Sequence, residues 1–463
     1  MKSIVSSFTL VALSSAINLI FNLLLAKLLG GHNYGTIIYF MSLINIIVLL
    51  IDFNNPALYM RFKIVYSDKK TFDLVFTYKT VVFLFLLIPI VFLLCKFFLN
   101  DCKISFLVSL IAYMDTILKT AALEFNSSGR INTAILVSLF LPRSLIFIFF
   151  MVLLFFGYSS PLYYLYVLLL VNFILCLILL IKFKPFLYLR LDFLKRAWKF
   201  YLLGILGLGF NEMAKILQKE LGDFTKLASL AIALLIINGL SMIGSVMGKY
   251  AFPKLHEAWK NRNIRRIEQI YRFHILLSTF SNMPILLFLS FNIGFISEVL
   301  GTEYIDLPYM FYILLIGYIF DLLTGITGSI LKATGNEHFE IFNETLRFAI
   351  GVAIMIVFRN SHFSIVLALA ISNSIFNLLK YLEVFLLFRL KPLSWIEFKM
   401  FFSYLGSLIL ILSTLYSFVY RCNKILFLFI SFSVILLYHI SFYYKYIKKK
   451  LDFSIYLNSE SLK

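Results

Sequence analysis

The chain has 463 residues, of which 61% are apolar and only 14% are charged, and its mean hydropathy is +0.93. Soluble domains contain about 25% charged residues, so this composition excludes a soluble protein and indicates an integral-membrane one. The net charge is +19. Its Lys and Arg residues lie in short loops between apolar runs, not along one exposed face, and we therefore expect no nucleic-acid partner.

Apolar runs long enough to cross a bilayer recur along the whole chain and predict about fourteen transmembrane helices of roughly 20 residues or more. The first run follows Lys2 and is too long for the core of a signal peptide, so we expect it to remain as a span. The predicted spans are 4–29, 34–60, 74–99, 104–125, 131–156, 161–183, 197–220, 223–250, 269–296, 306–333, 338–358, 362–388, 398–420 and 424–446.

The orientation of these spans follows from Lys and Arg, which accumulate in cytoplasmic loops. Alternate loops carry the excess, as in residues 182–199 and 249–272, whereas the loop 297–308 has three carboxylates and no cation. This asymmetry predicts a multi-pass membrane protein with both termini in the cytoplasm.

The longest predicted cytoplasmic connection is amphipathic. It spans 252–269 and begins FPKLHEAWKNRN, with Leu255, Ala258 and Trp259 at helical spacing and cations on other faces. This pattern favours a helix lying on the membrane surface, and an ordinary solvated loop is the alternative.

The cysteines and histidines show no pattern of a metal site or of a disulfide framework. The four cysteines have no paired spacing, and the six histidines include no HExxH motif. We therefore expect no disulfide, no metal and no cofactor.

Two short matches indicate an internal repeat, which is common in transporter folds. The segment LAKLLG (25–30) is echoed by LQKELG (217–222), and Asp115 with Gly129 is echoed by Asp321 with Gly335. The predicted architecture is all-α, with two six-helix lobes related by a parallel repeat and two additional C-terminal helices. The predicted domains are an N-terminal lobe 1–183, a cytoplasmic linker 184–196, a C-terminal lobe 197–388 and the extra helices with a basic tail, 389–463.

Four segments carry a resemblance to a known family. They are LLAKLLGGHNYG (24–35), FPKLHEAWKNRN (252–263), VLGTEY (299–304) and LKATGNEHFE (331–340). With them the chain resembles the multidrug, oligosaccharidyl-lipid and polysaccharide (MOP) exporter superfamily, specifically its flippases for O-antigen and capsular polysaccharide.

The resemblance implies an activity and its partners. It implies a flippase that moves undecaprenyl-pyrophosphate-linked oligosaccharide, an O-antigen or capsule repeat unit, from the cytoplasmic to the periplasmic leaflet by alternating access between two lobes. A polysaccharide polymerase and a chain-length regulator are further expected partners, together with membrane lipids. Drug exporters share the fold, and a fold does not fix a function.

Charged residues inside the spans are the candidate site residues, because each costs about 2.5 to 3.5 kcal/mol at the bilayer centre unless it faces a cavity or a partner. Arg143 follows Pro142 near the middle of its span. An Arg guanidinium matches a pyrophosphate through its bidentate fork, and the alternative is a buried ion pair with Asp115 or Glu124.

Two neighbouring spans carry polar stripes at helical spacing, which predict either a wet cavity wall or helix packing. One stripe is Asn211, Lys215, Gln218 and Gly222, and the other is Asn238, Ser241, Ser245 and Lys249. Lys249 is close enough to the cytoplasm to extend to the surface. Lys219 and its repeat counterpart Lys27 complete the predicted substrate-binding set, although the apolar neighbours of Lys27 favour an extended surface position for it.

Three acids within spans are candidates for coupling to H+ or Na+, namely Asp52, Asp115 and Asp321. An ion pair of Asp115 with Lys119, one turn later, is the structural alternative. The pairs Glu344 with Arg347 and Lys380 with Glu383 stand three residues apart and are expected to be structural.

Two other functions are compatible with the hydropathy. A membrane-embedded polysaccharide polymerase is disfavoured because no predicted periplasmic loop is large enough to hold catalytic residues, and we expect no enzymatic activity. A drug or cation antiporter of the same fold would favour acids in its cavity, whereas several of the deepest charges here are Arg or Lys.

Overall fold

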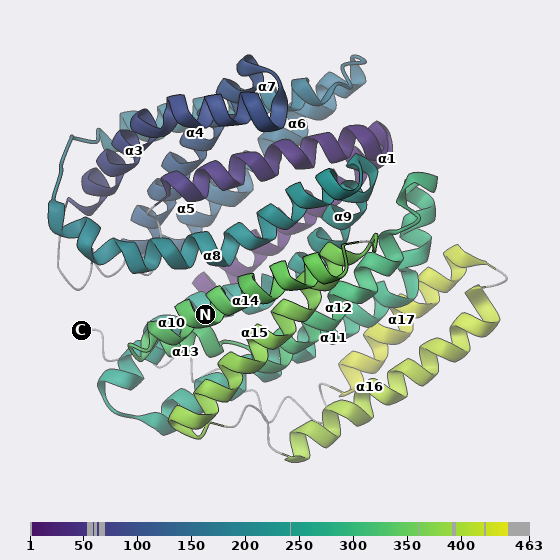
Figure 1. The fold of residues 1–463 in the computed structure, drawn as a ribbon. Coiled ribbons are helices and arrows are strands. Elements are labelled where there is room, and N and C mark those ends of the chain that lie inside the picture. The colour runs from purple at the N-terminus through teal and green to yellow at the C-terminus, as the bar shows by residue number, and fades with distance from the viewer. Residues whose placement is uncertain are drawn as a thin grey trace. The chain divides into compact units, whose positions relative to one another are not determined.

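The computed structural model describes residues 2–52, 59, 63, 70–240, 242–359, 361–390, 395–420 and 423–442. These residues are helical almost throughout, as Figure 1 shows, so the all-α prediction is confirmed. The first half contains α1 (Lys2–Ile51), α3 (Thr71–Leu94), the π-helix η2 (Cys95–Leu99), α4 (Cys102–Ser127), α5 (Ile131–Ile135), the π-helix η3 (Leu136–Phe140), α6 (Leu141–Phe155), α7 (Pro161–Phe183), α8 (Leu191–Leu221) and α9 (Phe224–Leu240).

The second half has the same all-helical character. It contains α10 (Met242–Lys260), α11 (Ile264–Leu300), the 3-10 helix η4 (Thr302–Tyr304), α12 (Leu307–Thr324), α13 (Thr327–Ala333), α14 (Glu337–Val357), α15 (Ser364–Phe388), α16 (Trp395–Leu415), the π-helix η5 (Tyr416–Tyr420) and α17 (Lys424–Phe442). Within the described residues, nine helices are long and apolar enough to cross a membrane.

In the described residues each of the fourteen predicted spans overlaps a helix, although several helices are joined or interrupted. The first two predicted spans form the single element α1, which is broken at Gly30, where φ is 75° and ψ is 168°. The predicted span 306–333 is split into α12 and α13 at Gly325. The sequence therefore predicts where the helices lie but not how each one is interrupted.

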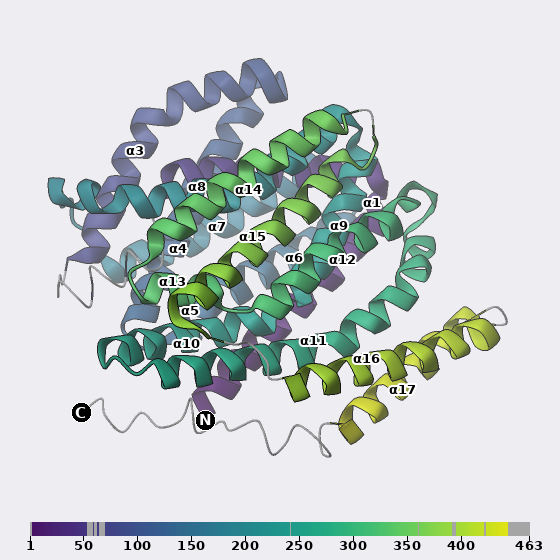
Figure 2. The same ribbon diagram turned by 60° about the horizontal axis from the view of Figure 1, so that its bottom comes forward.

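The chain forms two compact units, Met1–Ala231 and Ile232–Lys463, which divide within α9. In unit 1, α1 packs against α4 and α8, and α4 packs against α3 and α7. In unit 2, α15 packs against both α12 and α14, and Figures 1 and 2 show these three helices side by side. The two lobes predicted above, 1–183 and 197–388, were defined by the internal repeat and not by contacts between residues. They remain a prediction.

The two glycines matched by the internal repeat have the same local structure. Gly129, after α4, and Gly335, after α13, have φ of 78° and 81°. Each is followed by a residue whose N–H donates to a carbonyl five residues back, Arg130 to Phe125 at 2.9 Å and Asn336 to Leu331 at 2.8 Å. This is the Schellman helix end, which needs a left-handed residue, and the shared motif supports the repeat.

The amphipathic segment 252–269 is helical but does not place its apolar face on the membrane. α10 continues through Pro253 to Lys260, and α11 begins at Ile264. Leu255 and Ala258 are buried in a core shared with α11, α13 and α15. The helix was therefore predicted correctly. Leu255 and Ala258 pack within unit 2, and the position of the segment at the membrane surface remains a prediction.

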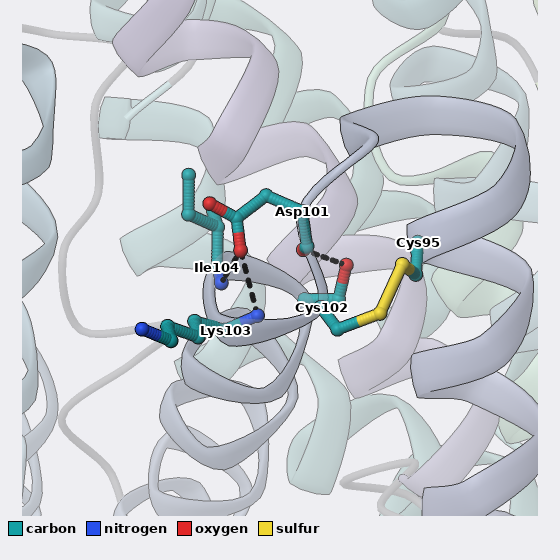
Figure 3. The surroundings of a disulfide bond; sticks show 6 residues. Cys95, Asp101, Cys102, Lys103 and Ile104 are labelled. Atoms are coloured by element: carbon teal, nitrogen blue, oxygen red, sulfur yellow. Dashed lines mark hydrogen bonds between the residues drawn. A yellow bond between two sulfur atoms is a disulfide. The ribbon is translucent and has the colours of Figure 1, made fainter.

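The expectation of no disulfide was also wrong. Cys95 and Cys102 form a disulfide bond across the turn between α3 and α4, with their Cα atoms 4.9 Å apart (Figure 3). The turn brings them together because Asn100 adopts φ of 52° and the Asp101 carboxylate caps α4 by accepting from the N–H groups of Lys103 and Ile104. The sequence did not predict this bond, because two cysteines seven residues apart across a helix end match no known disulfide pattern.

Candidate functional site

Arg143 lies in α6 of unit 1, directly after an irregular stretch of helix. The π-helix η3 and Pro142 precede it, and π-helical turns occur frequently at functional sites. Its Nη1 donates to the Ser14 hydroxyl of α1 at 3.2 Å. Ser14 is itself fully buried, so this contact fixes the guanidinium against α1.

The two carboxylates named as alternative partners of Arg143 are bound to other cations. Asp115 pairs with Lys119 at 2.8 Å, and Glu124 pairs with Lys63 at 2.8 Å while accepting from the Tyr59 hydroxyl at 2.6 Å. Among the described residues, no carboxylate forms an ion pair with Arg143. The guanidinium therefore keeps most of its donors for another ligand.

The polar stripe of α1 continues from Ser14 along the same helix face. Asn22 donates to the backbone oxygen of Asn18 at 2.7 Å and to its side-chain oxygen at 3.2 Å. The Tyr34 hydroxyl, beyond the break at Gly30, donates to Asn22 at 3.0 Å. This arrangement puts half-buried amide groups and Arg143 on neighbouring parts of unit 1, which is suited to binding a polar anionic headgroup.

Asp52, a predicted coupling residue, is held in an ion pair. Lys79 of α3 places its Nζ 2.6 Å from Asp52 Oδ1 and also donates to the Thr116 carbonyl and the Thr120 hydroxyl of α4, at 3.1 and 2.7 Å. The Lys79 side chain is only 1% exposed. Sequence reasoning missed Lys79, which lies in the third predicted span.

A second group of charges links α4 to α8. Lys119 pairs with Asp115 within α4 and also interacts electrostatically with Glu212 of α8. Glu212 in turn pairs with Lys215 at 2.8 Å. Unit 1 thus neutralises these intramembrane cations with carboxylates, which sets Arg143 apart.

The predicted stripe on α8 is only partly exposed. Asn211 and Lys215 are half-buried, but Gln218 is 2% exposed and points into the protein. Lys219 pairs with Glu220 at 2.9 Å and lies over the rings of Tyr39 and Phe224, at the end of α8.

The remaining predicted binding residues lie on several helices. Lys27 is exposed, in agreement with an extended surface position. Asn238 is exposed near the end of α9, whereas Ser241 and the side chains of Ser245 and Lys249 lie outside what the structure describes.

Asp321 lies near the end of α12 in unit 2, one turn before the helix is interrupted. Its carboxylate accepts a hydrogen bond from Asn377 of α15 and interacts electrostatically with Lys380. Lys380 also interacts with Glu340 and Glu344 of α14. The structure therefore joins Asp321 to a charged network of α12, α14 and α15.

The same network includes close contacts around α13. Lys332 Nζ lies 3.1 Å from Glu340 Oε1. A Cβ atom added to Gly328 would lie 2.7 Å from that same oxygen, so the glycine makes room for the carboxylate. Sequence reasoning missed Glu340, whose signal is that it stands four residues before Glu344 on one helix face.

The two expected structural pairs of unit 2 have different outcomes. Arg347 Nη2 lies 3.0 Å from Glu344 Oε2, which confirms that pair. Glu383 instead accepts from the Asn343 amide at 2.7 Å, and Lys380 Nζ lies 3.7 Å from the centroid of the Phe376 ring. Lys380 thus joins the acids of α12 and α14 and is not limited to its sequence neighbour Glu383.

The interruption between α12 and α13 leaves backbone oxygens that other helices satisfy. Gly325 has φ of 61°, and the Tyr271 hydroxyl of α11 donates to the Thr324 carbonyl at 3.0 Å. Interrupted transmembrane helices of this kind often line substrate or ion sites in transporters. In the part of the chain that the structure describes, no three His, Cys, Asp or Glu residues are grouped as a metal would require.

Comparison with known proteins gives fold relatives only. No protein-family model matches the chain, and no curated protein matches it. Among solved structures it is similar to the lipid II flippase MurJ in an inward closed conformation, with a TM-score of 0.70 and 16% identity over 95% of this chain and 99% of that one.

Two further structures come from transporters of the MOP superfamily. An inward-facing multidrug resistance transporter of the MATE family has a TM-score of 0.64 and 13% identity, over 83% of this chain and 98% of that one. A MOP-superfamily transporter from Pyrococcus furiosus, described as having a binding pocket of reverse polarity, has a TM-score of 0.55 and 13% identity over 84% and 96%. The chain therefore has the fold of the MOP-superfamily transporters.

Proposed function

We propose that the chain is a flippase, not an enzyme, and that it moves undecaprenyl-pyrophosphate-linked oligosaccharide, an O-antigen or capsule repeat unit, to the periplasmic leaflet. The observation that carries the proposal is Arg143, an intramembrane cation whose expected carboxylate partners bind other cations. An uncompensated guanidinium is costly in a membrane unless an anion binds it. The similarity to a flippase of lipid II adds support for a lipid-linked substrate.

In this proposal, Arg143 binds the pyrophosphate and the α1 stripe of Ser14, Asn18 and Asn22 replaces water around the first sugar. Asn211 and Lys215 form a secondary polar wall, while Lys27, Lys219, Asn238 and Lys249 take a peripheral part. Hydroxyl and amide groups donate and accept hydrogen bonds, which suits a sugar. A polysaccharide polymerase and a chain-length regulator would receive the product.

Ion coupling is the second part of the proposal. Asp52 and Asp115 are each in a direct ion pair, whereas the Asp321 carboxylate accepts a hydrogen bond from the Asn377 amide and interacts electrostatically with Lys380. Asp321 is therefore the most suitable of the three to exchange a proton or bind a sodium ion.

The proposed location is the inner membrane with both termini in the cytoplasm. The Cys95–Cys102 disulfide supports this orientation, because it lies at a turn predicted to be periplasmic and disulfides persist in oxidising compartments.

The test is the amount of undecaprenyl-linked oligosaccharide in each leaflet of cells that lack this protein and are complemented with variants. We expect intact repeat units to accumulate on the cytoplasmic face without the protein, and Arg143→Ala to fail to clear them at normal membrane levels. Arg130→Ala is the matched control, because Arg130 is exposed at the turn after α4. Unpolymerised repeat units in the periplasm would indicate a polymerase instead.

A drug or cation antiporter is the second candidate, which the MATE neighbours favour. It would need intramembrane acids free to bind a cation, whereas in unit 1 Asp52, Asp115 and Glu212 are all paired with lysines, which leaves Asp321 of unit 2 as the candidate acid. Drug sensitivity of the deletion strain, with no accumulation of lipid-linked sugar, would favour this function.

A further inference from the structure

Three helices end on a cation in the left-handed backbone region, where glycine is the favoured residue. Lys184 after α7, Arg262 after α10 and Arg389 after α15 have φ of 44°, 53° and 55°. All three lie at helix ends predicted to be cytoplasmic. A residue with a Cβ atom is disfavoured in this conformation. The backbone therefore does not favour Lys or Arg at these positions, and we look for the reason in the charge of the side chain.

Two of these cations lie at neighbouring helix ends in unit 2. The Arg262 N–H donates to the Trp259 carbonyl at 2.9 Å. The Trp259 ring packs edge-on against Phe388, with centroids 5.6 Å apart, and Phe388 directly precedes Arg389. The contact between the two rings fixes Arg262 and Arg389 at the same end of unit 2.

Two further cations, Lys260 and Arg265, lie close to Trp259 in the sequence. Together they form a surface that we call the basic rim, made of Lys260, Arg262, Arg265 and Arg389, all exposed. In the described residues none of the four forms an ion pair with a carboxylate. Partial burial, with a smaller contribution from the charge of Arg266, holds the pKa of Lys254 of α10 below its usual value.

The rim also has the apolar neighbours expected at a membrane interface. Trp259 is half-buried, and Ile264 and Leu387 are 37% and 44% exposed. Tryptophan is enriched where hydrocarbon meets headgroups, and clustered cations beside a transmembrane helix attract anionic lipids.

We propose that the basic rim is a binding surface for the headgroups of anionic phospholipids in the cytoplasmic leaflet. The cationic helix ends place their charges level with the lipid phosphates, while Trp259 and Phe388 stiffen the surface. If these charges served only to orient the helices, they could stand at any position of the loop, because the positive-inside rule counts the Lys and Arg residues of a loop without regard to their backbone conformation.

The backbone conformation provides a test in which folding and charge are separated. Replacing Arg262 and Arg389 by glycine removes both charges at positions where glycine is favoured, so the variant should unfold at the same temperature or higher. Purified full-length protein in detergent is mixed with phosphatidylglycerol or phosphatidylcholine of the same acyl chains, and bound lipid is counted by native mass spectrometry.

We expect the wild type to retain phosphatidylglycerol in preference to phosphatidylcholine, and the Arg262→Gly/Arg389→Gly variant to lose about tenfold or more of that preference. Arg262→Lys/Arg389→Lys should keep it. Asn100→Gly is the matched control, because Asn100 has φ of 52° but is uncharged and lies at the opposite helix end. If the glycine variant unfolds early, Arg262→Asn/Arg389→Asn takes its place, since Asn tolerates the same conformation.

Two results would overturn the proposal. One is a wild-type preference that persists in the glycine variant at equal stability. The other is undecaprenyl pyrophosphate binding to the wild type far more tightly than phosphatidylglycerol does and losing that affinity in the variant, which would assign the rim to a lipid-linked substrate. Transport is not measured, so failure here leaves the proposed flippase function untouched.

Discussion

Lys79 of α3 and Asp52 at the end of α1 form an ion pair of 2.6 Å within unit 1, and the lysine is almost completely buried. Removing one partner of such a pair leaves an uncompensated charge, which typically costs 3 to 5 kcal/mol, about as much as a domain can lose. We therefore expect Lys79→Met to lower the unfolding temperature sharply.

The double variant Asp52→Asn/Lys79→Met removes both charges and should recover most of that loss. Thermal unfolding of the purified protein in detergent provides the measurement. A single variant as stable as the wild type would show that water reaches the pair.

Gly328 and Glu340 provide a test of packing in unit 2. The Cβ atom of Gly328→Ala would lie 2.7 and 2.8 Å from the two carboxylate oxygens of Glu340, so the carboxylate must move away from Lys332. We expect a loss of about 1 to 3 kcal/mol, as for overpacking. Gly239→Ala is the control, because no atom lies within 4 Å of its added Cβ atom. Equal unfolding temperatures of the two variants would contradict the described contact.

The disulfide predicts a labelling pattern in whole cells. Cys95 and Cys102 should resist a maleimide that cannot cross the inner membrane until a reductant is added, and should then react. Cys95→Ser/Cys102→Ser should lose about 2 kcal/mol or somewhat more, the typical effect of a closed loop. The experiment uses a chain in which Cys176 and Cys422 are replaced by serine, because Cys422 lies in another turn predicted to be periplasmic. Labelling before reduction would show that Cys95 and Cys102 are free thiols, and no labelling after reduction would place the turn in the cytoplasm.

Asp223 predicts a pH dependence at the start of α9. Partial burial acts to raise the pKa of its carboxyl group, but hydrogen bonds from the Thr225 hydroxyl and the Lys226 N–H, at 2.6 and 2.7 Å, outweigh it and lower the pKa. A lowered pKa stabilises the folded state above the unfolded value of about 3.9, and this contribution is lost as the pH falls through the folded pKa.

Asp223→Ala should therefore lower the unfolding temperature at pH near 7, consistent with a helix cap worth about 1 kcal/mol. The difference from the wild type should shrink in acid. A difference that is the same at both pH values would mean that the cap does not depend on the charge of Asp223.

Hydropathy predicted the helices because a span must be apolar over its whole length. It did not predict the π-helix before Arg143 or the break at Gly325, since both depend on contacts with other helices. Pairs within one helix, such as Asp115 with Lys119, follow from helical spacing. Pairs between helices, such as Asp52 with Lys79, require the tertiary structure, and for this reason Lys79 and Glu340 were missed.

The turn between α3 and α4 also bears on how the protein enters the membrane. In the proposed orientation this turn is periplasmic, and thiols stay reduced in the cytoplasm, so Cys95 and Cys102 would be joined only after the turn has crossed the bilayer. Closure then ties the ends of two helices together and prevents the hairpin from slipping back. Whether Cys95 and Cys102 are oxidised therefore reports whether α3 and α4 have been inserted, and for any variant of the chain this can be measured on a gel.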